Sequence, residues 1–287
     1  MTLSGGVRLT ALMVLALAGV TPPALAQATG GRDGAVPRRI VSFNLCADQL
    51  VMALADPEQI AGLSPYAADP RLSVVTAAAA RFPRLDWNAE SVVGLAPDLV
   101  LIGPSARPTR AMLAAMQIRT VDVALVSTLE HARAQAREIG ALVGHPERGE
   151  AMARALEEAE RRLAALARRD VATGLVIERR GYTAGPDSLA AAMIAAAGLK
   201  PPAGAPSGYG GFLSLEHLLV IRPDVLVLKD APETAVDQSA LYLTHPALRQ
   251  RFPAQRIVAL PARYTLCGGP ALLEGLQYLE RALAPLR

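Results

Sequence analysis

The chain has 287 residues, of which 52% are hydrophobic and 19% charged, and this composition indicates a folded protein with a substantial core. The formal net charge is only +3 and the arginines are spread along the chain, which argues against a nucleic-acid-binding protein. Aromatic residues make up 4% of the chain, so the position of each one is informative.

The first 26 residues predict an export signal. Arg8 supplies positive charge, residues 9–20 are apolar, and residues 24–26 (ALA) form a small-residue cleavage pattern. The apolar run is shorter than the ~20 residues that span a bilayer, which favours cleavage after Ala26 over an uncleaved anchor. No Cys follows the run, which argues against a lipoprotein. We expect a periplasmic protein with a flexible lead-in at 27–37, in a compartment where disulfides form.

From residue 38 onward, short apolar runs alternate with helical patterns, as in parallel βαβ units. The same alternation resumes after residue 170 and continues to the end of the chain. Apart from the repeat described next, we predict strands at 38–43, 60–64, 119–125, within 171–180 and at 256–261, and helices at 47–55, 109–116, 188–197 and 270–283.

One pattern occurs twice. Residues 90–102 (ESVVGLAPDLVLI) and 216–228 (EHLLVIRPDVLVL) both contain a Glu, an apolar run, Pro-Asp and four apolar residues. Asn88 and Ser214 stand two places before each Glu and could cap a helix. Each copy therefore predicts a short helix, a turn and a buried parallel strand. The copies lie too far apart for a solenoid, and the spacing predicts two similar α/β lobes with a cleft between them.

Residues 128–169 have a different pattern. A helix opens near Leu129, a break follows at residues 144–149 (GHPERG), and no Gly or Pro occurs at 150–169. Three heptads at best do not sustain a coiled coil. We predict instead one helix at 146–169, which joins an N-terminal lobe at 38–145 to a C-terminal lobe at 170–287.

These features resemble the periplasmic solute-binding proteins of ABC importers for vitamin B12, ferric siderophores and haem. The resemblance rests on residues 39–64, the two repeats, the long helix and residues 180–199, and it covers essentially 38–286. It implies a class III periplasmic binding protein: an α/β fold of two similar lobes with parallel sheets, a single interlobe helix and a ligand in the cleft. We expect a monomer that delivers a corrinoid or an iron–siderophore to a permease dimer; haem is the alternative cargo.

The resemblance also assigns a docking role to an acid on each lobe, and the repeats align this role with Glu90 and Glu216. A permease dimer presents the same positive pocket twice, so a duplicated lobe can offer one acid to each pocket. A competing interpretation is that each Glu only stabilises the first turn of its helix through the helix dipole.

Ligands of α/β lobes bind beyond the carboxyl ends of the strands. Aromatic and basic residues at these predicted loops could stack on a planar ligand or pair with its anionic groups. Packing under a loop is the alternative for each aromatic. The candidates are Asn44, Cys46, Tyr66, Trp87, Arg180, Tyr182, Tyr209, Phe212, Arg263 and Tyr264, with Arg107 as a further cation. We expect no resident cofactor or protein-bound metal, since a metal would arrive only within the chelate.

The two cysteines, Cys46 and Cys267, lie at strand-to-helix junctions of opposite lobes. Three interpretations remain open: a disulfide across the floor of the cleft, free thiols that touch a ligand, or two small buried residues. An enzyme that uses Cys267 as a nucleophile is a further alternative. Its weakness is that no His with an orienting partner lies nearby in sequence, and the chain lacks a G-x-S-x-G, P-loop or dinucleotide motif.

Overall fold

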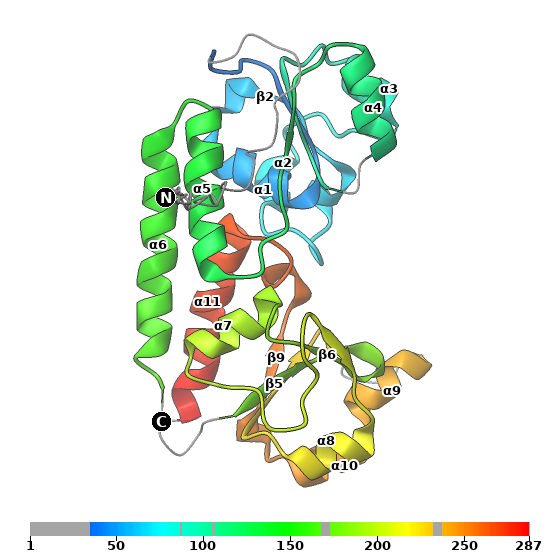
Figure 1. The fold of residues 1–287 in the computed structure, drawn as a ribbon, viewed down its shortest axis with the longest axis vertical. Helices are drawn as coiled ribbons and strands as arrows, with labels where there is room; N and C mark the ends of the chain where they lie inside the picture. Colours follow the sequence, from blue (N-terminus) through cyan, green and yellow to red (C-terminus); the bar gives the residue numbers. More distant parts are fainter. Residues whose placement is uncertain (1–34, 87, 105–106, 168–172, 232–236, 287) are drawn as a thin grey trace, which may run out of the picture.

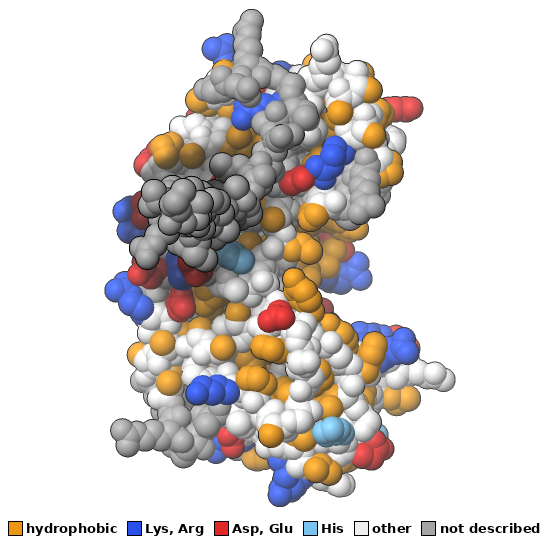
Figure 2. Space-filling model, viewed as in Figure 1, with side chains coloured by type: hydrophobic (Ala, Val, Ile, Leu, Met, Phe, Trp, Pro, Cys, Tyr) orange, Lys and Arg blue, Asp and Glu red, His pale blue; other side chains and the backbone are white. Residues whose placement is uncertain are grey.

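Two α/β lobes are stacked along the long axis of the protein and joined on one side by helices (Figure 1). The computed structural model describes residues 35–286, apart from 87, 105–106, 168–172 and 232–236. The expected signal peptide and most of the lead-in lie outside this range. Figure 2 shows the molecule hollowed between the lobes, on the side opposite the connecting helices.

The N-terminal lobe is built on a four-stranded, fully parallel sheet of order β2-β1-β3-β4. The central strands β1 and β3 are buried at every position, as expected for strands covered by helices on both faces. The strands are β1 (Ile40–Phe43), β2 (Ile60–Gly62), β3 (Leu99–Ile102) and β4 (Thr120–Asp122). The helices are α1 (Leu45–Leu54), η1 (Pro57–Gln59), η2 (Pro65–Ala68), α2 (Thr76–Ala79), α3 (Ala89–Val93) and α4 (Arg107–Ala115).

The C-terminal lobe has a five-stranded mixed sheet of order β7-β6-β5-β8-β9. Strands β5, β8 and β9 are parallel, whereas β6 and β7 run antiparallel to their neighbours. The strands are β5 (Gly174–Ile177), β6 (Tyr182–Ala184), β7 (Gly210–Phe212), β8 (Val225–Lys229) and β9 (Ile257–Leu260). The helices are η3 (Arg179–Gly181), α7 (Leu189–Ala196), α8 (Leu215–Ile221), α9 (Gln238–Thr244), α10 (Pro246–Arg251), η4 (Ala254–Arg256), η5 (Ala262–Tyr264) and η6 (Ala284–Leu286).

Three helices form the connection between the lobes: α5 (Leu129–Leu142), α6 (Pro146–Ala164) and α11 (Gly269–Leu283). Helix α6 begins where the sequence predicted it and ends at Ala164, before the predicted end at 169. The sequence did not predict that α5 folds back along α6 (Figure 1). Their contact is close, because a Cβ placed on Gly140 would lie 2.7 Å from the Cα of Gly149. No helix among the described residues is long and apolar enough to cross a membrane.

Both copies of the sequence repeat fold as a capped helix, a turn and a strand. The Asn88 side chain accepts a hydrogen bond from the backbone N–H of Ser91, and the Ser214 hydroxyl accepts one from the backbone N–H of His217. The two predicted helix caps are therefore confirmed.

The Pro-Asp turn of each copy ties two strands together at their amino ends. The Asp98 carboxylate accepts hydrogen bonds from the backbone N–H groups of Arg38 (2.7 Å) and Arg39 (3.0 Å), just before β1. In the second copy, Asp224 accepts bonds from the Thr173 backbone N–H (2.9 Å) and hydroxyl (2.8 Å), just before β5. The repeated Asp thus has a structural role, since it satisfies backbone groups that precede the neighbouring strand.

Candidate functional site

Three aromatic side chains and one arginine gather on strands β6 and β7 of the C-terminal lobe. Tyr182 and Phe212 are directly paired across the two strands, and their rings meet edge to face with centroids 5.6 Å apart. The Arg180 guanidinium lies 5.7 Å from the centroid of the Phe212 ring. Tyr209, just before β7, is 72% exposed, and Phe212 is 69% exposed. We call Arg180, Tyr182, Tyr209 and Phe212 the aromatic cluster.

Local structure holds the aromatic cluster at the carboxyl end of β5. The chain turns back there through η3, in which Arg180 has a left-handed backbone with φ of 61°. An ion pair between Arg179 and Asp237 ties η3 to α9. The Tyr182 hydroxyl donates to the backbone carbonyl of Tyr209 at 3.3 Å, which joins the two strands on the exposed side. The cluster is therefore a supported surface rather than a set of loose side chains.

The sequence predicted all four cluster residues as cleft candidates but placed them in loops. That placement is wrong for Tyr182 and Phe212, which lie in β6 and β7. Exposed rings beside a guanidinium can stack on a planar apolar ligand and pair with a carboxylate or phosphate at its edge. Large exposed apolar groups that cluster on a protein surface commonly mark a binding site.

The other two candidates of this lobe differ in exposure. Tyr264 is only 9% exposed and packs in the core, with its ring centroid 5.5 Å from that of Tyr278. The expectation that Tyr264 faces the cleft from a loop is therefore wrong. Arg263 lies over the Tyr264 ring at 4.9 Å, and its guanidinium donates to the backbone carbonyl of Pro70 at 3.2 Å. Arg263 thus reaches from one lobe to the other.

In the N-terminal lobe, the candidates lie where β1 and β2 end. The Asn44 side chain accepts hydrogen bonds from the backbone N–H groups of Cys46 (2.9 Å) and Ala47 (3.2 Å), so it caps α1. Tyr66, in η2, is 43% exposed and could reach a ligand. Trp87 and the side chain of Arg107 lie outside the described part of the chain.

The structure joins Cys46 and Cys267 in a disulfide, with their Cα atoms 5.1 Å apart. Cys46 is 8% exposed and Cys267 is fully buried. Of the three interpretations of these residues, the structure thus contains the disulfide. A half-cystine offers no thiolate, so neither residue can act as the nucleophile of a cysteine-dependent enzyme in this state.

Both acids of the repeat are exposed, in the first turns of α3 and α8. A hydrogen bond from its own backbone N–H, followed by one from the Ser214 hydroxyl, holds the pKa of the Glu216 carboxyl below its usual range. Glu216 is therefore ionised at neutral pH and available at the surface. A docking role requires both carboxylates to lie at the surface, and both do. Each also lies in the first turn of a helix, where the helix dipole favours an acid, so the competing interpretation stays open.

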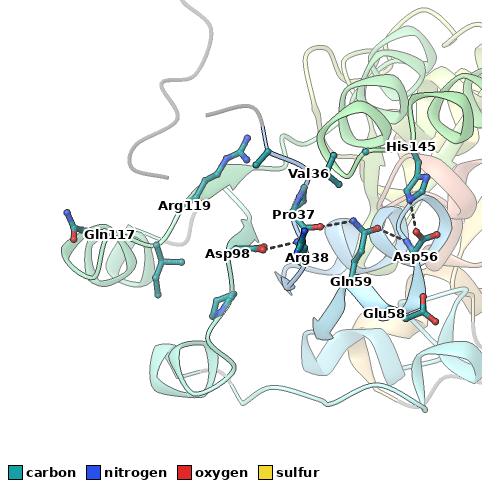
Figure 3. A pocket seen from close by; sticks show the side chains of 14 residues that line it. Val36, Pro37, Arg38, Asp56, Glu58, Gln59, Asp98, Gln117, Arg119 and His145 are labelled. Carbon is teal, nitrogen blue, oxygen red and sulfur yellow. Dashed lines mark hydrogen bonds and ion pairs between the residues drawn. The ribbon is translucent and has the colours of Figure 1, made fainter. Parts of the chain in front are cut away.

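A separate hollow of about 970 Å³ lies at the amino ends of the N-terminal strands (Figure 3). Its lining includes both cations and anions, among them Arg38, Asp98 and Arg119. Ligands of parallel α/β sheets bind at the opposite, carboxyl ends of the strands. This hollow therefore lies at the edge of the sheet opposite to the one where such ligands bind.

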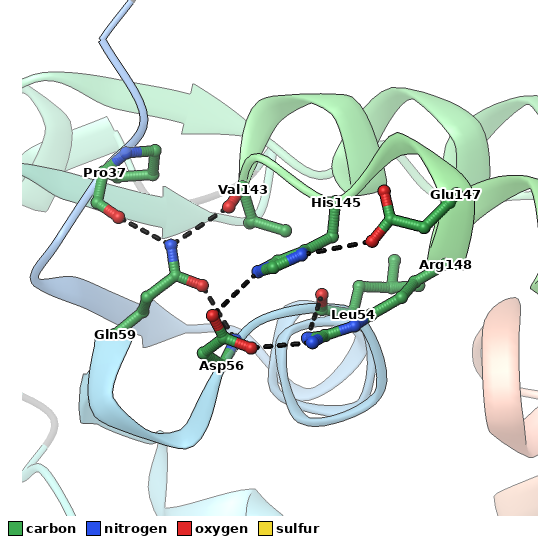
Figure 4. A network of polar contacts seen from close by, with 8 residues as sticks. All are labelled: Pro37, Leu54, Asp56, Gln59, Val143, His145, Glu147 and Arg148. Carbon is green, nitrogen blue, oxygen red and sulfur yellow. Dashed lines mark hydrogen bonds and ion pairs between the residues drawn. The ribbon is translucent and has the colours of Figure 1, made fainter.

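A polar network at one side of this hollow has a structural role (Figure 4). The Gln59 amide donates to the carbonyls of Pro37 (2.7 Å) and Val143 (3.0 Å). Asp56 contacts both His145 (3.0 Å) and Arg148 (2.7 Å), and hydrogen bonding by Arg148 is the main reason that the pKa of Asp56 is lowered. These contacts fix the start of α6 and the chain before β1 to the end of α1.

Within the described residues, no group of three or more His, Cys, Asp or Glu side chains could hold a metal ion. The chemistry that the aromatic cluster offers is stacking, hydrogen bonding and charge pairing with a ligand.

Comparison with known proteins identifies the family. The profile described as "Periplasmic binding protein" matches residues 40–256. A cobalamin-binding protein of Halobacterium salinarum is 28% identical over 261 residues, which are 86% of this chain and 69% of the relative. The apo structure of the periplasmic heme-binding protein RhuT from Roseiflexus sp. RS-1 is also 28% identical, with a TM-score of 0.68 and coverage of 86% of this chain and 98% of RhuT.

A third comparison concerns the fold alone. The periplasmic vitamin B12-binding protein BtuF of Vibrio cholerae is 17% identical, with a TM-score of 0.65 and coverage of 86% of this chain and 97% of BtuF. The relatives named here are binding proteins. The two-lobed architecture, the family profile over most of the chain and these relatives agree, and the chain belongs to the periplasmic binding protein family.

Proposed function

We propose that this protein captures a cobalamin-type corrinoid in the cleft between its lobes and delivers it to the permease of an ABC importer. The metal arrives as part of the ligand, and the protein has no resident cofactor. The observation that carries this proposal is the aromatic cluster, which presents two rings that are about 70% exposed beside Arg180 at the carboxyl end of β5. The cobalamin-binding relative supports the choice of ligand.

Haem is a second candidate, and one residue favours it specifically. Tyr209 is the most exposed ring of the aromatic cluster, and a phenolate is a known type of iron ligand. Arg180 could pair with a propionate of the same ligand. The heme-binding RhuT, equal in identity to the cobalamin-binding relative, supports this candidate.

One titration series separates these candidates. Purified protein is titrated with cyanocobalamin, hemin and a ferric siderophore, and binding is followed by calorimetry and by the absorption spectrum of the ligand. We expect the cognate ligand to bind below about 1 μM and Phe212→Ala to weaken it about tenfold, because a stacking surface is lost. Val220→Ala, at an exposed apolar position on α8, is the matched control and should have no effect.

Tyr209→Phe distinguishes the two tetrapyrroles. If cobalamin is the ligand, loss of one hydroxyl should change its affinity little. If haem is the ligand and Tyr209 binds its iron, the charge-transfer band of the complex should disappear. Absence of binding for the whole panel would contradict the proposed ligand class, and a time-dependent change of the bound ligand's spectrum would indicate an enzyme.

The proposal also includes export and docking. Mass spectrometry of the protein from the periplasm should give a mature chain that starts at Gln27. Replacing Glu90 and Glu216 together by Arg should abolish uptake in cells without changing ligand affinity, because each introduced Arg would face a positive pocket of the permease and be repelled by it. Glu130→Arg is the matched control, since Glu130 is also in the first turn of a helix, α5, but is not part of the repeat. Normal uptake by the double variant would leave only a helix-stabilising role.

A further inference from the structure

The two lobes are joined covalently at two separate places. The chain passes between them through α6, and the disulfide joins Cys46 in α1 of the N-terminal lobe to Cys267 just before α11. The two half-cystines are 221 residues apart in sequence. Because the two half-cystines are so far apart in sequence, the bond closes most of the chain into one loop. It therefore restricts how the two lobes can move relative to each other, and not only a local turn.

The surroundings of the disulfide are a packed core and not a flexible tether. Cys46 and Cys267 belong to one buried cluster with Leu50, Val51 and Ala271, in which α11 contributes to the core of the N-terminal lobe. Gly269 approaches Leu50 so closely that a Cβ there would lie 2.8 Å from a Leu50 methyl carbon. Packing of this density resists rotation of α11 against α1.

A reversible contact lies four residues from the disulfide. Arg263 donates to the Pro70 carbonyl of the opposite lobe at 3.2 Å and to the Tyr264 hydroxyl at 3.3 Å. Because Tyr264 is anchored in the core of the C-terminal lobe, the guanidinium is held in position to reach Pro70. The segment from Arg263 to Cys267 therefore contacts the N-terminal lobe at both of its ends.

We propose that the Cys46–Cys267 disulfide sets the opening of the ligand cleft, so that the oxidised protein offers its ligand a gap of fixed width. The inference rests on the proposed function only in taking the interlobe space as the ligand site. A preset gap lowers the entropy that binding must overcome, because the two lobes are already ordered relative to each other. Without the bond, α6, the packing around α11 and the Arg263 contact remain, and the lobes rotate over a wider range.

The test measures the distance between the lobes without any ligand. p-Acetylphenylalanine replaces Met116 in the N-terminal lobe and Val220 in the C-terminal lobe, both exposed, and its ketone carries spin labels that need no cysteine. Pulsed electron paramagnetic resonance then gives the distance distribution. We expect Cys46→Ala/Cys267→Ala to widen the distribution about twofold and Arg263→Met to widen it less.

A second measurement covers the case in which the double variant does not fold. Dithiothreitol added to the folded, labelled protein should widen the distribution in the same way, with intact secondary structure by circular dichroism. The affinity for cyanocobalamin and hemin, measured separately, should fall about tenfold in the reduced protein. An unchanged distribution after confirmed reduction would overturn the inference. Failure of both ligands to bind the oxidised protein would instead contradict the proposed function and leave the distance result standing.

Discussion

The two lobes share a scaffold but differ in what is attached to it. Each has a capped helix, a Pro-Asp turn and a buried strand, and each uses the Asp to bind the chain before a neighbouring strand. Among the described residues, only the C-terminal lobe adds antiparallel strands, β6 and β7, which hold the aromatic cluster. The duplicated part therefore supports the fold, and the part without a counterpart holds the candidate recognition surface.

A second difference concerns a buried acid. Asp48, four residues after the cap of α1, is fully buried and accepts hydrogen bonds from the Ser64 hydroxyl (2.5 Å) and backbone N–H (3.0 Å). Burial raises the pKa of Asp48 to about 7 from its ordinary value of 3.8, against the opposing effect of hydrogen bonds from Ser42 and Ser64. In the C-terminal lobe, the position four residues after the cap of α7 is Ala192.

The largest expected effect on stability comes from Asp48→Asn, which removes the buried titratable acid from the N-terminal lobe. Between pH 4 and 7 the folded wild-type protein holds a proton on Asp48 that the unfolded chain has released, so its stability decreases as the pH rises. The shift of the pKa corresponds to about 4 kcal/mol across this window. The amide of the substituted side chain cannot ionise. The free energy of unfolding of the variant, relative to that of wild type, should therefore rise by that amount from pH 4 to pH 8.

Urea unfolding at several pH values measures this gain. Exposed acids with lowered pKa values, such as Asp56 and Glu147, act in the opposite direction in both proteins, and their effect cancels in the difference. Two parallel curves of stability against pH would show that Asp48 does not titrate as a buried acid.

The next largest effect concerns the strands that only the C-terminal lobe has. Gly210, at the start of β7, has φ of 135°, and a Cβ there would lie 2.3 Å from the Thr183 carbonyl oxygen. Gly210→Val should therefore destabilise the protein by about 3 kcal/mol and weaken ligand binding, because β6 and β7 would separate. Gly208→Ala is the matched control: Gly208 has φ of 61° but open space around its Cα, so the cost should be about 1 kcal/mol. Equal costs for the two variants would contradict this account.

The smallest effect compares the two Pro-Asp turns directly. Asp224→Ala should cost about 2 kcal/mol and Asp98→Ala about 1 kcal/mol, since the bonds of Asp224 are partly buried and those of Asp98 are exposed to competing water. Thermal unfolding of both variants under one condition measures the ratio. A larger cost for Asp98 would mean that the two turns do not share one role.

Local patterns predicted the parts of the fold that local chemistry determines. The repeated strands, the caps Asn88 and Ser214 and the start of α6 follow from apolar runs and turn residues, and the structure confirms them. Strands β6 and β7 have only three residues each, and β7 contains two glycines, so they lack the alternation that identifies a strand.

The candidate site was predictable as a set of residue types but not as an arrangement. The sequence identified Arg180, Tyr182, Tyr209 and Phe212 because they are aromatic or basic residues at predicted loops near the ends of strands. Burial of Tyr264 depends on Tyr278, and burial of Asp48 depends on Ser64, which are partners that only the tertiary structure brings together. Sequence spacing carries no record of such contacts.

The position of α11 has a consequence for the order of folding. Ala271 in its first turn and Cys267 just before it belong to a core whose other buried residues lie within 40–143, so that core stays incomplete until the last helix has been synthesised and docked. Until then, Leu50 and Val51 lack part of the packing that covers them in the folded protein. A fragment that ends at Ala165 should consequently aggregate rather than fold as an independent lobe.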